Sequence, residues 1–132
     1  MADDRLTLAQ TFFQAYFDGR VDDAVALLEP DVRIHLPGRA RIAGDFVGPH
    51  AVAEHLKQFL QMTEDPINVL GYDDWLVGNV YIGGIVRLEL QRPGRFDQFR
   101  IVYLVQVSEK LKISRVDIFY DNPDVFERFF NT

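Results

Sequence analysis

His35, in the segment IHLPG, is the strongest candidate for chemistry in this chain, because an imidazole titrates near neutral pH. The alternation of apolar and polar residues from Val32 to Leu36 predicts a strand that breaks at Pro37, so His35 lies where a strand meets a loop. Asp45, in that loop, could act with His35 as an acid or base, and Tyr103 could donate a hydrogen bond to a developing oxyanion. The alternative is that His35 is a hydrogen-bonded edge residue and Asp45 a turn residue.

A metal site is the next possibility, but the spacing of His50 and His55 argues against one. His50 and His55 are five positions apart. On a helix their side chains point about 140° apart and cannot bind one metal together. The chain has no cysteine, which excludes a thiolate zinc site, an iron–sulfur cluster and a cysteine nucleophile. We expect no metal site, and no motif implies an organic cofactor.

Length and charge narrow the class of protein. The 132 residues suit a single domain spanning 1–132. A net charge of −6 argues against a nucleic-acid partner or an anionic membrane, which need a positive surface. The N-terminal segment MADDRLTL is acidic, and no stretch approaches the ~18 apolar residues of a membrane span. We therefore expect a soluble cytoplasmic protein.

Periodicity and turn residues predict helices first and strands afterwards. Thr7 and Gln10 have the spacing of a capping box, and Asp18-Gly19 ends the first helix. A strand begins at Asp31, and the segment from Pro37 to Gly48 is expected to be a loop. Asp73-Asp74 is expected to be a turn. The other predicted elements are a short helix Val21–Leu28, a helix Pro49–Met62, strands Ile67–Tyr72, Asn79–Gln91, Phe96–Ser108 and Lys112–Tyr120, and a short helix beginning at Pro123.

The apolar face of these strands, together with the helices, predicts a pocket lined almost wholly by hydrocarbon. Trp75 is expected at its opening, although a tryptophan beside a turn is more often plain packing. The predicted pocket residues are Phe12, Tyr16, Leu36, Leu56, Phe59, Trp75, Val86, Ile101, Tyr103, Val116, Ile118 and Tyr120.

The order of these elements resembles the nuclear transport factor 2-like superfamily, and within it the SnoaL-like branch related to ketosteroid isomerases. The resemblance rests on FFQAYFDGRVDDAVALLEPDV, IHLPG, IAGDFVGPHAV and KISRVDIFYD, in this order. It implies an α+β fold: a cone-shaped barrel whose strongly curved, mixed but mostly antiparallel sheet wraps around N-terminal helices, with a short C-terminal helix. The branch includes polyketide cyclases, isomerases, dehydratases and epoxide hydrolases, so the fold does not select one reaction.

The catalytic residues of ketosteroid isomerases are not matched here. Their carboxylate base falls on Leu36, their oxyanion tyrosine on Phe12, and their protonated acid near Tyr103. The acidic residue of the polyketide cyclases falls closest to Ile118, with Asp117 one position away and therefore on the opposite face of the strand. Ketosteroid isomerase chemistry is not expected.

Three hypotheses remain. The first is an isomerase, cyclase or hydrolase that acts on a small hydrophobic metabolite through His35, Asp45 and Tyr103. The second is a non-catalytic protein that binds such a molecule. The third is a structural homodimer whose cone is filled by its own side chains, which include eleven phenylalanines. Resemblance to dimeric family members implies a homodimer through the outer sheet face. An inward-facing His35 would favour the enzyme, and a cavity of a few hundred Å³ would favour either ligand hypothesis.

Overall fold

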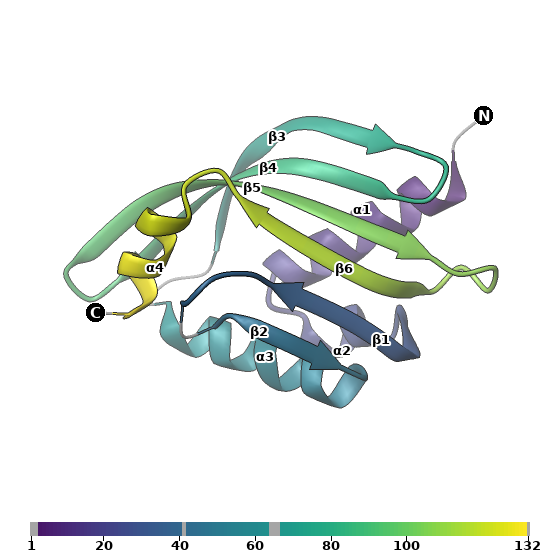
Figure 1. Ribbon diagram of the computed structural model, residues 1–132, viewed down its shortest axis with the longest axis horizontal. Helices are drawn as coiled ribbons and strands as arrows, with labels where there is room; N and C mark the ends of the chain where they lie inside the picture. Colours follow the sequence, from purple (N-terminus) through teal and green to yellow (C-terminus); the bar gives the residue numbers. More distant parts are fainter. Residues whose placement is uncertain (1–2, 41, 64–66, 132) are drawn as a thin grey trace.

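One six-stranded sheet organises the protein, in the strand order β2-β1-β6-β5-β4-β3 (Figure 1). The computed structural model describes residues 3–40, 42–63 and 67–131. All neighbouring strands are antiparallel except β1 and β6. The elements are α1 (Asp4–Phe17), α2 (Val21–Val25), β1 (Leu28–Leu36), β2 (Gly44–Val47), α3 (Pro49–Met62), β3 (Asn68–Val77), β4 (Ile82–Arg92), β5 (Arg95–Val107), β6 (Ile113–Tyr120) and α4 (Pro123–Asn131).

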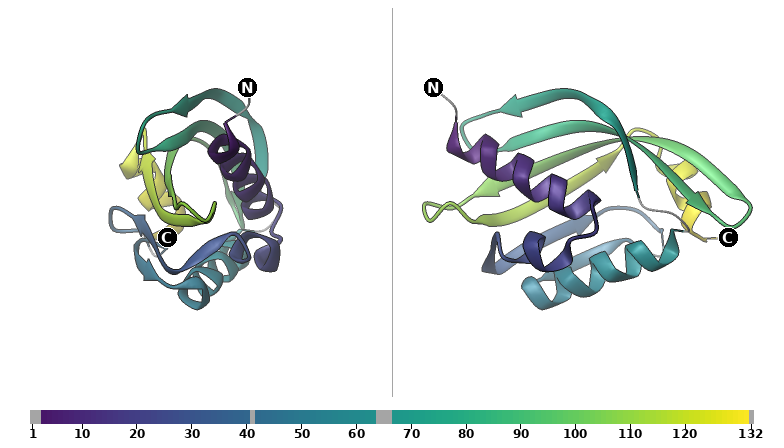
Figure 2. Two further views of the ribbon diagram at one scale, coloured as in Figure 1. Left: turned by 90° about the vertical axis from the view of Figure 1, so that its right-hand side faces the viewer. Right: turned by 180° about the vertical axis from the view of Figure 1, so that it is seen from behind.

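The sheet is strongly curved, and helices close its concave side. The end-on view in Figure 2 shows the strands curling around a central space, with α1 beside β3 and α3 below β1 and β2. At one end α4 buries Phe126, Phe129 and Phe130, and Phe99 of β5 packs edge-on against two of these rings. The predicted fold class is therefore confirmed. Among the described residues, no helix is long and apolar enough to span a bilayer.

Alternation along the strands assigns their two faces as the sequence predicted. On β4, Ile82, Val86 and Leu88 are fully buried, whereas Arg87 between them is exposed. The same alternation buries Ile34 and Leu36 of β1 on the concave side. A period of two therefore separates a hydrocarbon interior from a mixed outer face.

Two predicted helix boundaries were wrong. The capping box at Thr7 and Gln10 is not used, because α1 begins at Asp4 and the Asp3 carboxylate accepts a hydrogen bond from the Arg5 N–H at 2.9 Å. The short helix α2 ends at Val25 rather than Leu28. Leu28 already belongs to β1, where it is in register with Ile113 of β6. Pairing with a distant strand overrides local helix propensity here.

Two strand predictions were also wrong. Gly44–Val47, expected to be a loop, pairs with β1 as the antiparallel edge strand β2. The expected turn at Asp73-Asp74 does not occur, because β3 continues to Val77 through irregularities in its register with β4. The Asp73 carboxylate forms ion pairs with Arg87 at 2.8 Å and Arg100 at 3.0 Å. These arginines lie on β4 and β5, and their charges allow an acidic residue inside β3.

Candidate functional site

The concave interior contains a cavity of about 10 Å³ between α1, α3, β1, β5, β6 and α4. This volume is close to that of one water molecule. The predicted pocket residues Tyr16, Leu36, Phe59, Ile101, Tyr103, Ile118 and Tyr120 line it, together with Ile42 and Phe126, which were not predicted. The interior is otherwise filled by side chains of its own cone.

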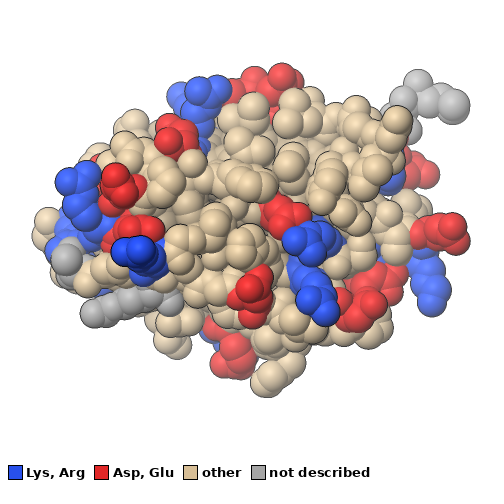
Figure 3. Space-filling model, viewed as in Figure 1, with Lys and Arg blue, Asp and Glu red and all other residues tan. Residues whose placement is uncertain are grey.

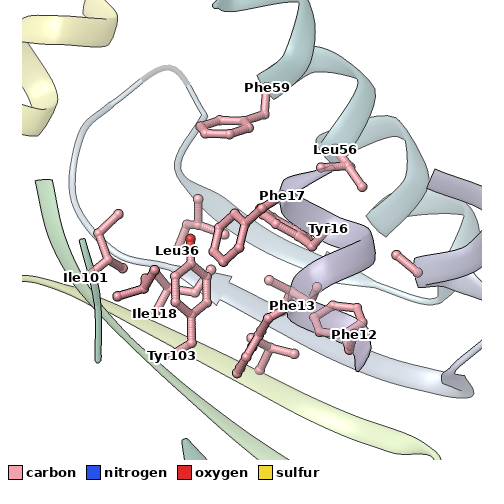
Figure 4. Packing of buried hydrophobic residues seen from close by; sticks show 14 of the residues in the cluster. Phe12, Phe13, Tyr16, Phe17, Leu36, Leu56, Phe59, Ile101, Tyr103 and Ile118 are labelled. Atoms are coloured by element: carbon pink, nitrogen blue, oxygen red, sulfur yellow. The ribbon is translucent and has the colours of Figure 1, made fainter. Parts of the chain in front are cut away.

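Figure 4 shows how this filling arises, with side chains from α1 and from the strands pointing into the same space. Tyr103 of β5 packs against Phe13 at 5.4 Å and Phe17 at 5.5 Å between ring centroids. The remaining interior residues predicted for the pocket, Phe12, Leu56, Val86 and Val116, are buried in the core and do not line the cavity. Among the described residues, this cavity is far smaller than the few hundred Å³ that would favour an interior ligand.

Tyrosine hydroxyls are the polar groups of this cavity. Burial raises the pKa values of Tyr16, Tyr103 and Tyr120, so all three remain protonated. The Tyr120 hydroxyl is buried without a hydrogen-bond partner among the described residues, and its ring stacks on Phe126 at 3.9 Å. The cavity is an apolar space with hydrogen-bond donors at its edge.

Tyr16 is held by His55, a residue that the sequence analysis did not select for a site. The Tyr16 hydroxyl lies 3.2 Å from Nε2 of His55, whose side chain is buried and stacks on Phe46 at 4.4 Å. Burial lowers the pKa of His55 to about 4, so the ring is neutral at pH 7. Its Nδ1 has no partner among the described residues.

The signal for His55 was present in the helical pattern. Val52, Leu56 and Phe59 form the apolar stripe of α3, and position 55 falls on the same stripe. A histidine there is expected to be buried, and His50, in the first turn, is exposed. The sequence could not show that Tyr16 of α1 lies opposite.

His35 and Asp45 lie together on the outer face of the sheet. They are in register across β1 and β2, with His35 Nδ1 2.6 Å from Asp45 Oδ1 and side chains 43% and 76% exposed. On the other side His35 is in register with Asp117, whose carboxylate binds Arg115 at 2.8 Å. Tyr103 faces the interior, so the structure does not bring the three predicted catalytic residues together. Their catalytic roles stay predictions, and the inward-facing His35 that would favour the enzyme hypothesis is not observed.

Trp75 lies in a separate groove of about 350 Å³ between α1 and β3. In the view from behind, α1 runs along the concave side next to β3 (Figure 2). The Trp75 ring stacks on the rings of Tyr72 and Phe13, with ring centroids 4.4 Å and 6.0 Å apart. It also lies over Gly84, where an added Cβ would be 2.9 Å from the indole. The groove is lined by Gln10, Gln14, Phe17, Asp18, Val69, Tyr72 and Trp75.

This groove has apolar walls and a polar rim. Gln10, Gln14 and Asp18 follow one another at intervals of four on the exposed face of α1. Burial raises the pKa of Tyr72 to about 12, and the nearby Asp18 carboxylate adds to the shift. Phe17, which is 2% exposed, separates the groove from the interior. The sequence analysis included Trp75 but missed the other lining residues, because their proximity depends on how α1 packs beside β3.

A third feature is an apolar patch on the outer face of the sheet. Ile85 of β4, Val102 of β5 and Phe119 of β6 are cross-strand neighbours, and Phe119 is 48% exposed. They line a shallow hollow of about 240 Å³. Figure 3 shows an uncharged area across the middle of this face, with charged side chains on either side.

Comparison with solved structures places this architecture among known folds. No protein-family profile matches the chain, and no curated protein matches it in sequence. Bal32a, from a soil-derived mobile gene cassette, is similar with a TM-score of 0.88 and 17% identity, over 97% of both chains. An NTF2-like protein from Burkholderia xenovorans has a TM-score of 0.84 and 18% identity, over 97% of this chain and 96% of that one.

A third similar structure holds a ligand. RV0760c from Mycobacterium tuberculosis, in complex with estradiol-17β-hemisuccinate, has a TM-score of 0.78 and 18% identity, over 93% of this chain and 97% of that one. Identities at this level establish the fold and no shared activity. The predicted resemblance is confirmed in this respect, and the chain has the fold of the nuclear transport factor 2-like superfamily.

Proposed function

We propose that this protein binds a small, planar, largely apolar molecule in the groove between α1 and β3. The observation that carries the proposal is the volume of about 350 Å³ between the aromatic walls Tyr72 and Trp75 and the apolar floor Phe17. Pockets for small molecules typically have a few hundred Å³ and mostly apolar walls. The groove meets both conditions, whereas the interior cavity of about 10 Å³ fails the first.

The geometry of Trp75 supports a flat ligand. Its indole is held between Gly84 and the rings of Tyr72 and Phe13, so Trp75 loses little conformational entropy when a ligand packs beside it. The Gln10 and Gln14 amides at the rim can donate or accept hydrogen bonds from a substituent.

Two other grooves suit an apolar ligand less well. One beside α4 is lined by Asp124, Glu127, Arg128 and Asn131, all polar. Another beside α3 is lined mostly by long polar side chains, with Phe46, Ala51 and His55. We propose that the protein binds its ligand without a reaction, because the groove between α1 and β3, here called the aromatic groove, contains no hydrogen-bonded acid–base pair among its described residues. We also propose that it does so in the cytoplasm, as predicted from the sequence.

Fluorescence provides a direct test, because Trp75 is the single tryptophan of the chain. Titration with the neutral dye N-phenyl-1-naphthylamine is expected to quench Trp75 emission by energy transfer and to saturate. Energy transfer reaches across a molecule of this size, so a variant must locate the dye. Gln14→Phe places a ring in the groove and is expected to weaken binding by about tenfold, equivalent to about 1.4 kcal/mol.

Gln58→Phe is the matched control, because it makes the same change on the exposed face of α3. It is expected to leave dye affinity unchanged. Absence of saturable quenching with the folded wild-type protein would refute ligand binding. Equal affinities for wild type and Gln14→Phe would show that the dye binds elsewhere and would refute the location.

A further inference from the structure

The aromatic groove has an unusual charge at one end. Asp18 is the C-cap residue of α1; its N–H donates to the Gln14 carbonyl at 2.9 Å, and the N–H of Gly19 donates to the Tyr16 carbonyl at 3.3 Å. The C-terminal end of a helix carries a partial negative charge and favours cationic side chains. The last turn of α1 contains no basic residue, so a carboxylate stands where the helix dipole disfavours it. This end of the groove therefore carries negative charge.

The single cation next to Asp18 among the described contacts compensates weakly. Arg20 Nη2 lies 3.4 Å from Asp18 Oδ2, while Arg20 Nη1 lies closer to Asp23, at 3.1 Å. All three side chains are about half exposed or more, at 49%, 54% and 64% for Arg20, Asp18 and Asp23. Exposed pairs of this kind are screened by solvent and contribute little. Arg20 can keep its shorter contact with Asp23 when Asp18 binds another cation.

The groove itself contains no lysine or arginine among its described lining residues. Its two aromatic side chains, Tyr72 and Trp75, are π systems, and a π system attracts a cation. The negative end at Asp18 lies next to Tyr72, as the pKa of Tyr72 indicates. The net charge of the chain, −6, adds to the attraction for a cation approaching from solvent.

We propose that the ligand of this groove is an organic cation, an aromatic amine whose ring packs on Tyr72 and Trp75 and whose ammonium group lies beside Asp18. This inference rests on the proposed function, since it names the chemical class of molecule that the same groove binds. It goes beyond that function by excluding carboxylate-bearing ligands, for which the groove offers no positive group.

Three probes with one ring system test this charge preference: 1-naphthylmethylamine, 1-naphthylmethanol and 1-naphthylacetate. Isothermal titration calorimetry at low salt is expected to show the amine binding about three- to tenfold more tightly than the alcohol, and the carboxylate more weakly than either. The preference is expected to decrease as salt screens the Asp18 charge.

Asp18→Asn is expected to bring the affinity for the amine down to that for the alcohol. Asn suits a helix C-terminus, and thermal unfolding verifies that the variant is folded. Asp22→Asn, the same change at an exposed position outside the groove, is the matched control and is expected to keep the preference.

The outcomes separate the two proposals. If none of the three probes binds, the proposed function fails and this inference fails with it. If the alcohol binds but the amine binds no more tightly, the groove is a ligand site and the cation preference is refuted. A preference for the amine that survives in Asp18→Asn also refutes it, because the charge would then act from elsewhere.

Discussion

Lowering the pH from 7 to 5 is expected to destabilise this protein through one residue, His55. Burial lowers its pKa from 6.5 to about 4 in the folded protein. The unfolded chain therefore binds a proton at a higher pH than the folded protein does. Since protonation favours the state that binds the proton more tightly, the stability contributed by neutral His55 is lost as the pH falls from about 6.5 toward 4.

The magnitude follows from the two pKa values. At a pH low enough to protonate His55 in both states, its lowered pKa of about 4 reduces the free energy of unfolding by about 3 kcal/mol. Between pH 7 and pH 5 the same linkage gives a loss of about 2 kcal/mol. A typical domain is stable by about 5–15 kcal/mol, so a loss of about 2 kcal/mol is a large fraction of its stability and is measurable.

Urea denaturation of wild type and His55→Leu at both pH values measures this contribution. Leu removes the titrating group and keeps an apolar side chain on the stripe of α3. All other ionisable groups are shared, so the difference between the two pH dependences isolates His55. The variant is expected to lose about 2 kcal/mol less than wild type between pH 7 and pH 5. Removing the partner of the Tyr16 hydroxyl costs stability at both pH values and cancels in this comparison.

His50→Leu, the same change at the exposed start of α3, is the matched control and is expected to keep the wild-type pH dependence. The reasoning is refuted if His55→Leu and wild type lose the same free energy between the two pH values. A pKa near 6.5 for His55 in an NMR titration of the folded protein would refute it as well.

Three further predictions concern the groove, the outer face and the interior. Gly84→Ala, whose Cβ would press on the Trp75 ring, is expected to cost about 1–3 kcal/mol in urea denaturation and to weaken dye binding. We also propose a homodimer through the outer face: light scattering should give twice the chain mass of 15.2 kDa, Phe119→Glu should give a monomer, and Val80→Glu, a control at an exposed apolar residue between β3 and β4, should not. Phe126→Ala is expected to enlarge the interior cavity at a cost of about 3–5 kcal/mol, and benzene should raise the melting temperature of that variant alone.

Much of the fold could be predicted because its signals are local. Alternation assigned the buried faces of β4, β5 and β6 correctly, and Pro49 placed the start of α3. Three of the four errors share one physical cause, which is pairing with another strand, whereas the start of α1 is set locally by the Asp3 cap. Gly44–Val47 becomes a strand because β1 lies beside it, and Asp73 is tolerated inside β3 because two arginines from β4 and β5 neutralise it.

The candidate site was harder to predict because each part combines elements far apart in sequence. The contact between Tyr16 and His55 joins α1 to α3, and the aromatic groove joins α1 to β3. Local patterns predict which face of its own element a residue occupies. They do not determine which two faces meet, since many packings bury the same amount of apolar surface.

The interior illustrates why an apolar lining does not by itself indicate a pocket. A ligand cavity and a solid core are lined by the same residue types, so the alternation that placed Ile101, Tyr103 and Ile118 inside fits both. What distinguishes them is the volume left after α4 docks and inserts Phe126, and that depends on tertiary packing. With about 10 Å³ left inside and about 350 Å³ beside Trp75, the space available to a ligand lies outside the cone. Trp75 therefore belongs to the binding surface that we propose, as a wall of the groove.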